Sequence, residues 1–201
     1  MNGLSSANYT VARDNGYTEN EFSILTCQEK NTLFPLFQGV MINNFEFNRA
    51  LYVSGTGQSA NWDKDVSAGR QLKPQYLVSF ESIRSIRPWT FTPHLITRRL
   101  GGSTNRRSLI SSVSVFPSGN SLATLFSQVD SHLLVGLNSV LNSLCFDFQW
   151  RMRLSGTNQS WTFLKDSFVP DPNSKLMRFI AHMGLRLVGT HPSFAGLWSL
   201  D

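Results

Sequence analysis

The stretch from Ser139 to Pro172 reads SVLNSLCFDFQWRMRLSGTNQSWTFLKDSFVPDP, and it decides the fold. Apolar residues recur there at spacings of three and four, which predicts a helix with one buried face formed by Leu137, Leu141, Leu144, Phe148 and Met152. Arg151 and Arg153 lie in the last turn of this helix, where positive charge interacts favourably with the negative end of the helix dipole. Gly156 is the expected left-handed cap, and the aromatic run that follows predicts a short strand.

Upstream of this stretch, the positive charge is concentrated in the middle of the chain. Residues 51–120 carry nine basic and three acidic side chains, whereas residues 1–50 have a net charge of −2. Six arginines lie within 24 residues and are interleaved with Trp89, Phe91 and His94; they are Arg84, Arg87, Arg98, Arg99, Arg106 and Arg107. Arginine donates in a planar fork that suits phosphate oxygens and the edge of guanine. A solvated basic face is the alternative, but the run contains no lysine and includes aromatic residues.

Shorter patterns indicate the remaining elements. Pro35 and Gly39 bracket apolar residues between 33 and 45, which predicts a strand, a tight turn and a second strand. Trp62 interrupts a polar loop and is expected to be a local packing plug. Alternation over 108–116 predicts a strand after a turn at Gly101-Gly102, and Leu176–Met183 begins a second amphipathic helix.

Composition restricts the class of protein. The chain has 201 residues, 41% hydrophobic and 12% aromatic, so a single folded domain with a substantial core is expected. No apolar run reaches the roughly 18 residues of a membrane span, and no secretory signal begins the sequence. Cys27 and Cys145 have neither a disulfide nor a metal-ligand spacing, and Cys145 reads as a small apolar helix residue. We therefore expect a reducing cytoplasm, no membrane and no metal.

The order of the motifs resembles the C-terminal specificity domain of TaqI-like N6-adenine DNA methyltransferases and fused restriction–modification proteins. In the central stretch the matches are Leu141-Asn142-Ser143, Phe146-Asp147-Phe148, Arg151, Gly156-Thr157, Phe163, Leu164-Lys165 and Val169-Pro170. Upstream, Pro35-Leu36-Phe37, Gly39, Met41-Ile42, Phe45 and Thr104-Asn105-Arg106-Arg107 follow the same pattern. Gln38, Val40 and Asn43 depart from it, and Arg106 replaces an acid. The resemblance covers about residues 33–194.

This resemblance implies a module that recognises double-stranded DNA for a methyltransferase catalytic domain or subunit. Phosphate or base-edge contacts are expected from Arg98, Arg99, Arg106 and Arg107, with Arg84 and Arg87 in the same basic surface. Backbone contacts are expected from Arg151, which Asp147 would orient, and from Ser155, Gly156, Thr157 and Asn158. The chain has no glycine-rich S-adenosylmethionine turn and no N/D-P-P-aromatic loop; Asp171-Pro172-Asn173-Ser174 lacks the second proline and the aromatic residue. No catalytic residue or cofactor is expected in this chain, and S-adenosylmethionine belongs to a separate domain.

We therefore predict an α+β fold, with a twisted, mostly antiparallel sheet over 33–120 and helices near 121–154 and 174–187 packed on it. Residues 1–32 would end a linker from a catalytic domain, 33–172 would form the target recognition domain, and 173–201 would form a C-terminal helix and tail. The expected setting is bacterial restriction–modification or phage defence. One alternative is half of a type I restriction specificity subunit, which a long heptad helix after Pro172 would favour. A more distant one is a carbohydrate-binding or structural β-rich domain with aromatic platforms.

Overall fold

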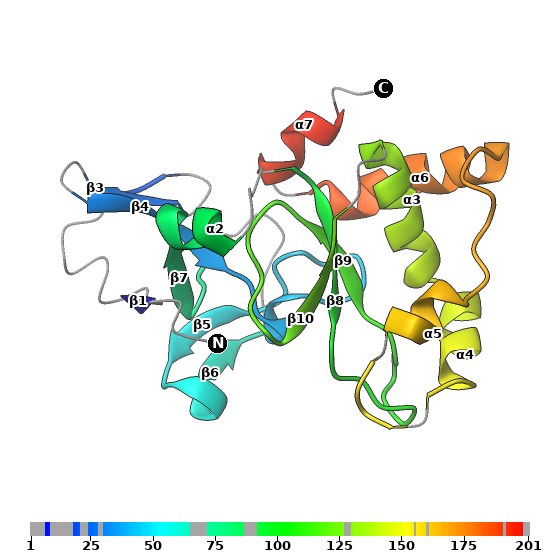
Figure 1. Ribbon diagram of the computed structural model, residues 1–201, viewed down its shortest axis with the longest axis horizontal. Helices are drawn as coiled ribbons and strands as arrows, with labels where there is room; N and C mark the ends of the chain where they lie inside the picture. Colours follow the sequence, from blue (N-terminus) through cyan, green and yellow to red (C-terminus); the bar gives the residue numbers. More distant parts are fainter. Residues whose placement is uncertain are drawn as a thin grey trace.

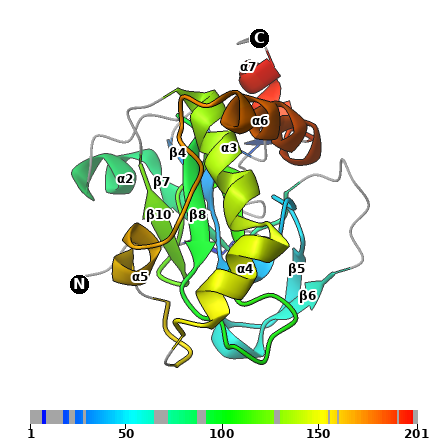
Figure 2. The same cartoon turned by 90° about the vertical axis from the view of Figure 1, so that its right-hand side faces the viewer.

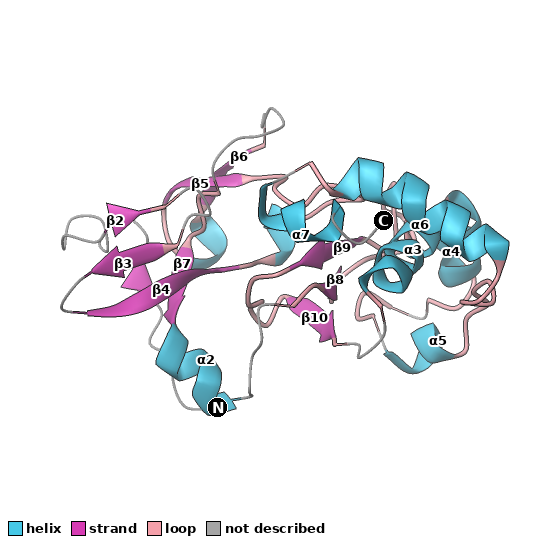
Figure 3. Cartoon of the chain, turned by 90° about the horizontal axis from the view of Figure 1, so that it is seen from above, coloured by secondary structure: helices cyan, strands magenta, loops and turns pink. Residues whose placement is uncertain are grey.

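The computed structural model describes residues 7–8, 18–20, 24–27, 30–64, 72–86, 92–126, 130–154, 156–159, 161–190 and 192–198. It confirms the α+β class, because small antiparallel sheets have helices packed against them. The strands do not form the one continuous sheet expected over 33–120 but are divided among three sheets. Seen from above, helices α3, α4 and α6 gather at one end of the molecule, and strands β2, β3, β4 and β7 lie at the other (Figure 3).

The sheet at the strand-rich end has the order β1-β7-β4-β3-β2. Its strands are β1 (Ala7–Asn8), β2 (Thr18–Glu19), β3 (Leu25–Cys27), β4 (Lys30–Leu36) and β7 (Tyr76–Ser79). Helix α2 (Phe80–Ile86) continues from β7 and packs against β4 and β7 (Figure 1). Phe34, Val78 and Ile83 form a small apolar cluster between this helix and its sheet.

Two further sheets complete the β-structure. The central one has the order β10-β8-β9, with β8 (His94–Arg98), β9 (Ser111–Ser114) and β10 (Leu122–Leu125). The other pairs β5 (Leu51–Ser54) with β6 (Asn61–Asp63), and η2 (Gly57–Ser59) lies between them. Trp62 packs edge-on against Tyr52, with ring centroids 5.8 Å apart, so it has the local packing role that the sequence predicted.

The prediction of a hairpin between residues 33 and 45 is wrong. Only its first strand, β4, forms, and the 3-10 helix η1 (Gly39–Met41) follows it. Phe37 instead exchanges backbone hydrogen bonds with residues 117 and 119, at N–O distances of 2.8 and 2.7 Å. Phe37, Met41 and Ile42 are all fully buried. Alternating exposure would leave one of these large side chains in water, so burial favours the helical turn over a second strand.

The second half of the chain is mainly helical. It contains α3 (Ser131–Leu141), α4 (Leu144–Arg151), α5 (Trp161–Lys165), α6 (Lys175–Val188), η3 (Pro192–Phe194) and α7 (Ala195–Trp198). Asp130, Ser143 and Ser174 cap the first, second and fourth of these helices by accepting a hydrogen bond from a backbone N–H. The helix predicted over 174–187 is therefore confirmed. The run at 161–165 is a short helix, not the expected strand.

The central stretch does not form one helix with the expected buried face. The chain breaks at Asn142-Ser143, where Ser143 starts α4 by accepting a hydrogen bond from Phe146 N at 3.1 Å. This break changes the direction of the chain between α3 and α4 (Figure 2). Helix α4 consequently buries Phe146, Asp147 and Trp150. Leu144, Phe148 and Met152 are 73%, 69% and 75% exposed, so the sequence-based prediction was wrong for these three residues.

Two other expectations for this stretch need correction. Helix α4 ends at Arg151 with Met152 as its C-cap, and Gly156 is not among the residues with a positive φ, so it is not the left-handed cap. Cys145 lies on α4 as expected, but it is exposed and not part of the apolar packing. Both errors follow from extending a single helix past Asn142.

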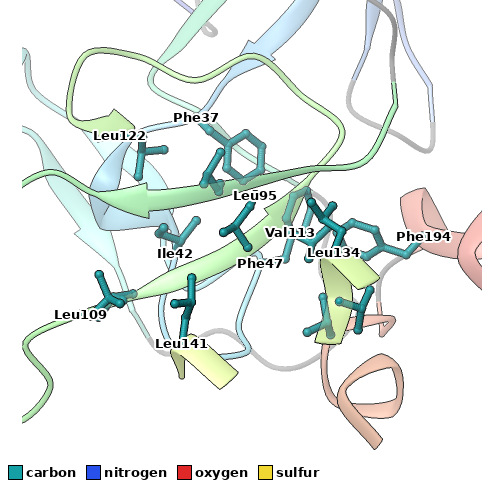
Figure 4. Close-up of a cluster of buried hydrophobic side chains, with 14 of the residues drawn as sticks. Phe37, Ile42, Phe47, Leu95, Leu109, Val113, Leu122, Leu134, Leu141 and Phe194 are labelled. Carbon is teal, nitrogen blue, oxygen red and sulfur yellow. The ribbon is translucent and has the colours of Figure 1, made fainter. Parts of the chain in front are cut away.

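The main core lies between the central sheet and helices α3 and α6. Phe37 stacks on Phe47 and Phe116, and Phe194 meets Phe47 edge-on at 4.8 Å. Leu95 and Val113 from the sheet meet Leu134 and Leu141 of α3 in the same cluster (Figure 4). Close packing of α3 and α6 depends on Gly136 and Gly184, where an added Cβ would press on Met177 and Ser139. No helix among the described residues is long and apolar enough to cross a membrane.

Candidate nucleic-acid interface

The loop between β8 and β9 brings together the two stretches in which most of the predicted DNA contacts lie. Residues 99–101 pair with residues 157–159: Gly101 N donates to Thr157 O at 2.9 Å, and Gln159 N donates to Arg99 O at 2.9 Å. A Cβ on Gly101 would collide with the Ser108 carbonyl oxygen and the Gln159 side chain. The pairing therefore requires glycine at 101. Thr157 and Asn158 are exposed, so the arginine-rich loop and the Gly-Thr turn form one surface.

Arg151 holds this loop from beneath. Its Nε donates to Asp147 Oδ2 at 2.8 Å, and its Nη1 donates to Ser103 O at 2.7 Å. Its Nη2 donates to Asn105 O at 2.6 Å and to Arg106 O at 2.7 Å. Every nitrogen of the guanidinium thus has an acceptor within the protein. A contact between Arg151 and DNA stays a prediction, and the geometry supports a positioning role.

Asp147 completes this support from a buried position. Its Oδ1 accepts hydrogen bonds from Ser108 N at 2.7 Å and Leu109 N at 3.1 Å. Burial by itself raises the pKa of this carboxyl, but the Arg151 guanidinium and the two backbone N–H groups outweigh burial and hold the pKa below its usual range. The carboxylate is therefore charged at neutral pH. The predicted pairing of Asp147 with Arg151 is present, although it directs Arg151 to the loop carbonyls.

Arg98 also forms hydrogen bonds within the protein. It is half-buried, and it donates from Nε to Gly39 O at 2.6 Å and from Nη2 to Ile42 O. Burial, and then the charge of Arg49, lower the pKa of Arg98. Its side chain therefore ties η1 to strand β8, so that the segment 39–49 lies beside the arginine-rich loop.

The other arginines of the loop are more available. Arg99 is exposed and donates from Nη1 to Asn120 Oδ1 at 2.7 Å. Arg107 donates from Nη2 to Asn142 O at 3.2 Å, and its buried Nη1 has no hydrogen-bond partner among the described residues. Arg106 is exposed, and within the described part of the chain no acceptor is assigned to its guanidinium. Arg106 is thus the cation of this loop that is freest to meet an external anion.

A two-part depression lies on this surface. One part is lined by Gly39, Val40, Asn43, Arg49, Lys64, Arg98, Leu100 and Ser121. The other is lined by Asn43, Asn44, Arg98, Asn105, Arg106, Arg107 and Ile110. The two parts share Asn43 and Arg98, and no acidic residue is present among the described residues that line them. We name this surface the basic depression.

Sequence reasoning missed Arg49, Lys64, Asn43 and Asn105 as parts of this surface. Arg49 makes an ion pair with Glu46 at 3.4 Å and donates from Nη1 to Lys64 O at 2.8 Å, which places Lys64 at the rim. Both cations come from segments whose local composition is not basic. No spacing in the sequence indicates that η1 returns to the loop after β8, so only the fold could identify them.

The remaining predicted contacts are Arg84, Arg87, Ser155 and Gly156. Arg84 is exposed on α2, which packs on the five-stranded sheet, away from the loop after β8 (Figures 1 and 2). Arg87 and Ser155 lie outside the described residues. Gly156 is exposed, and a Cβ there would meet nothing within 4 Å, so the turn leaves room for close approach of a ligand. Among the described residues, no group of three or more His, Cys, Asp or Glu side chains could hold a metal ion.

Comparison of the chain with protein-family models, with curated proteins and with solved structures finds no match.

Proposed function

We propose that this chain is the target-recognition part of a bacterial adenine-specific DNA methyltransferase or of a restriction–modification or phage-defence enzyme. It would bind duplex DNA and hold it against a catalytic domain supplied by another part of the enzyme. The observation that carries the proposal is the basic depression beside the turn 156–159. Arg49, Lys64, Arg98, Arg106 and Arg107 come to it from segments far apart in the sequence.

The residues that line the basic depression suit a polyanion, such as DNA, whose base edges carry hydrogen-bond donors and acceptors. Arg106 offers an exposed guanidinium for a phosphate or for the O6 and N7 atoms of guanine. Asn105 offers an amide, which can pair with adenine N6 and N7, whereas the amide of Asn43 already donates to Glu46 Oε2 at 3.1 Å. Arg98 and Arg151 keep the two loops in place through carbonyl oxygens. The cations are spread over both parts of the depression, which favours an extended ligand over a single small anion.

The alternatives receive less support from the structure. Helix α6 has 14 residues and buries one face against α3, so it does not provide the long heptad helix that would favour a type I specificity subunit. Trp62 packs against Tyr52 rather than offering a free aromatic platform for a sugar. No observation in the described residues therefore favours either alternative over DNA recognition.

Duplex binding as a function of salt tests the proposal. If about four to six phosphates are neutralised, log K should fall with log salt at a slope of roughly −4 to −5. Arg106→Gln should weaken binding and reduce the slope by about one unit if Arg106 meets a phosphate. Arg84→Gln is the matched control, because Arg84 is an exposed arginine on α2, and it should change neither quantity. A flat salt response, or no binding at roughly 50 mM salt, would overturn the proposal.

A further inference from the structure

Large apolar side chains lie exposed on α4 and the chain beside it. Leu144, Phe148 and Met152 follow each other at intervals of four residues, which places them in one row along the helix. Phe168 is 84% and Val169 45% exposed. Gln149 fixes them next to the helix, because its Oε1 accepts from Phe168 N at 2.8 Å and its Nε2 donates to Phe168 O at 3.4 Å. We name these five apolar residues the α4 apolar face.

The α4 apolar face is large for a surface left in water. At roughly 150–250 Å² for a full aromatic side chain, Phe148 and Phe168 alone expose about 230–380 Å², and Leu144, Met152 and Val169 enlarge the face. The largest contiguous apolar patch on a typical monomer is about 300–600 Å² and is often functional, and a standard protein interface takes about 800 Å² from each partner. The face would thus supply a substantial part of one partner's share of an interface. It lies at the helical end of the molecule, remote from the five-stranded sheet (Figures 1 and 2).

The charges around this face suit association with an identical surface. Asp147 is buried and Arg151 is held by Asp147 and the loop carbonyls, so neither reaches the rim. Lys165 and Asp166 are adjacent exposed residues of opposite sign. Lys165 of one copy can therefore meet Asp166 of a second copy, while Arg153 is already bound to the Asp166 carbonyl oxygen within its own chain. Helix α6 differs: its exposed row of Leu176, Phe179, Met183 and Leu187 lies on a helix with Lys175, Arg178 and Arg186 and no acidic residue. Two copies of α6 would repel each other, so α4 is the self-compatible row.

We propose that the α4 apolar face binds a second copy of this chain and forms a two-fold dimer. The row is symmetric about its middle residue, Phe148, with one large apolar residue four positions away on each side. Across a two-fold axis at Phe148, two antiparallel α4 helices would set Leu144 of one copy against Met152 of the other, and the two Phe148 rings against each other. Phe168 and Val169 would widen the contact. This inference is independent of DNA binding.

Molar mass in solution tests the proposal. Light scattering or sedimentation from about 1 to about 100 μM should show the dimer mass rising with concentration, as expected for a modest interface. Phe148→Glu should leave only monomer over the whole range, because the axis would then bring two carboxylates together. Phe179→Glu on α6 is the control, since Phe179 is also 63% exposed, and its dimerisation should match the unchanged chain. Thermal unfolding of both variants checks that they fold.

Disulfide cross-linking tests whether the two-fold axis of the dimer lies at Phe148. In a background with C27S and C145S, F148C should form an intermolecular disulfide under mild oxidation, and F179C should form far less. A monomer at the highest concentration, with no F148C cross-link, would overturn the proposal. So would a dimer that Phe148→Glu leaves intact, because its interface would lie elsewhere. Neither measurement requires DNA, so a failure here would not bear on the DNA-recognition proposal.

Discussion

At the scale of single residues, Arg151 and Asp147 form the ion pair that supports the loop of the proposed DNA interface. Arg151→Ala removes the hydrogen bonds to Ser103 O, Asn105 O and Arg106 O and leaves Asp147 without its ion-pair partner. We expect a loss of unfolding free energy of about 1–3 kcal/mol, since hydrogen bonds to charged groups are among the stronger ones. Denaturant unfolding measures this loss, and hydrogen exchange of amides 103–109 should show that the loop opens.

Arg151→Lys separates a positioning role from a simple charge effect. Lysine keeps the positive charge but cannot span the acceptors that the planar guanidinium reaches. We therefore expect Arg151→Lys to loosen the loop nearly as much as Arg151→Ala. Full recovery of stability and DNA affinity with lysine would show that Arg151 acts only as a point charge.

His94 gives the molecule a pH dependence of its own. Burial lowers the pKa of His94 to about 4, despite opposing backbone hydrogen bonds with Thr92 and Phe116. Below a pH of about 6.5 the imidazole of His94 takes up a proton in the unfolded chain but not in the folded chain. The contribution of His94 to stability therefore falls between about pH 6.5 and about pH 4 and levels off below that. The shift corresponds to about 3 kcal/mol. His94→Asn, which can keep the bond to Thr92 O, should flatten this part of a stability–pH curve, and an unchanged curve would contradict the assignment.

The loop 99–109 is the element on which the proposed DNA interface depends. Gly101→Ala should cost about 1–3 kcal/mol and weaken DNA binding, because the new methyl group would collide with the Ser108 carbonyl oxygen. Gly156→Ala is the matched control on the facing turn: its methyl group meets open space, and stability should change by less than about 0.5 kcal/mol. Thermal unfolding and duplex titration measure both variants. Equal losses would show that the close approach at Gly101 is not what holds the two segments together.

The helices show how far sequence reasoning reaches at this scale. The period of apolar residues located α6 and the helical character of residues 131–151, but it gave one helix instead of α3 and α4 and assigned the wrong buried face to α4. It could not detect the break at Asn142-Ser143, because Asn142 is held by bonds to Ser111, which lies 31 positions away in the sequence. The row through Leu144 and Phe148 therefore read as buried. Likewise Arg151 fits a DNA contact by sequence, and only the fold shows the carbonyl oxygens that surround it.

At the scale of the whole molecule, we expect the chain to bind DNA without catalysing a reaction on it. We expect the isolated 201 residues to show no methyltransferase or nuclease activity and not to bind S-adenosylmethionine, because the motifs for the cofactor and the flipped base are missing from the sequence. Isothermal calorimetry with S-adenosylmethionine is the direct measurement. Stoichiometric binding of the cofactor to the purified chain would contradict this expectation and the division of labour in the proposed function.

The way in which Asp147 and Arg151 hold the loop 103–109 affects how the sequence of this loop can vary. Asp147 and Arg151 reach residues 103–109 only through main-chain N–H and carbonyl groups. The side chains at Ser103, Thr104, Asn105 and Arg106 are exposed and are not used by this support. The frame is thus indifferent to which residues occupy these four positions, and a randomised library over them should retain folded members at high frequency. In the proposed DNA-recognition role, a change at these four positions would alter the sequence preference at little cost in stability.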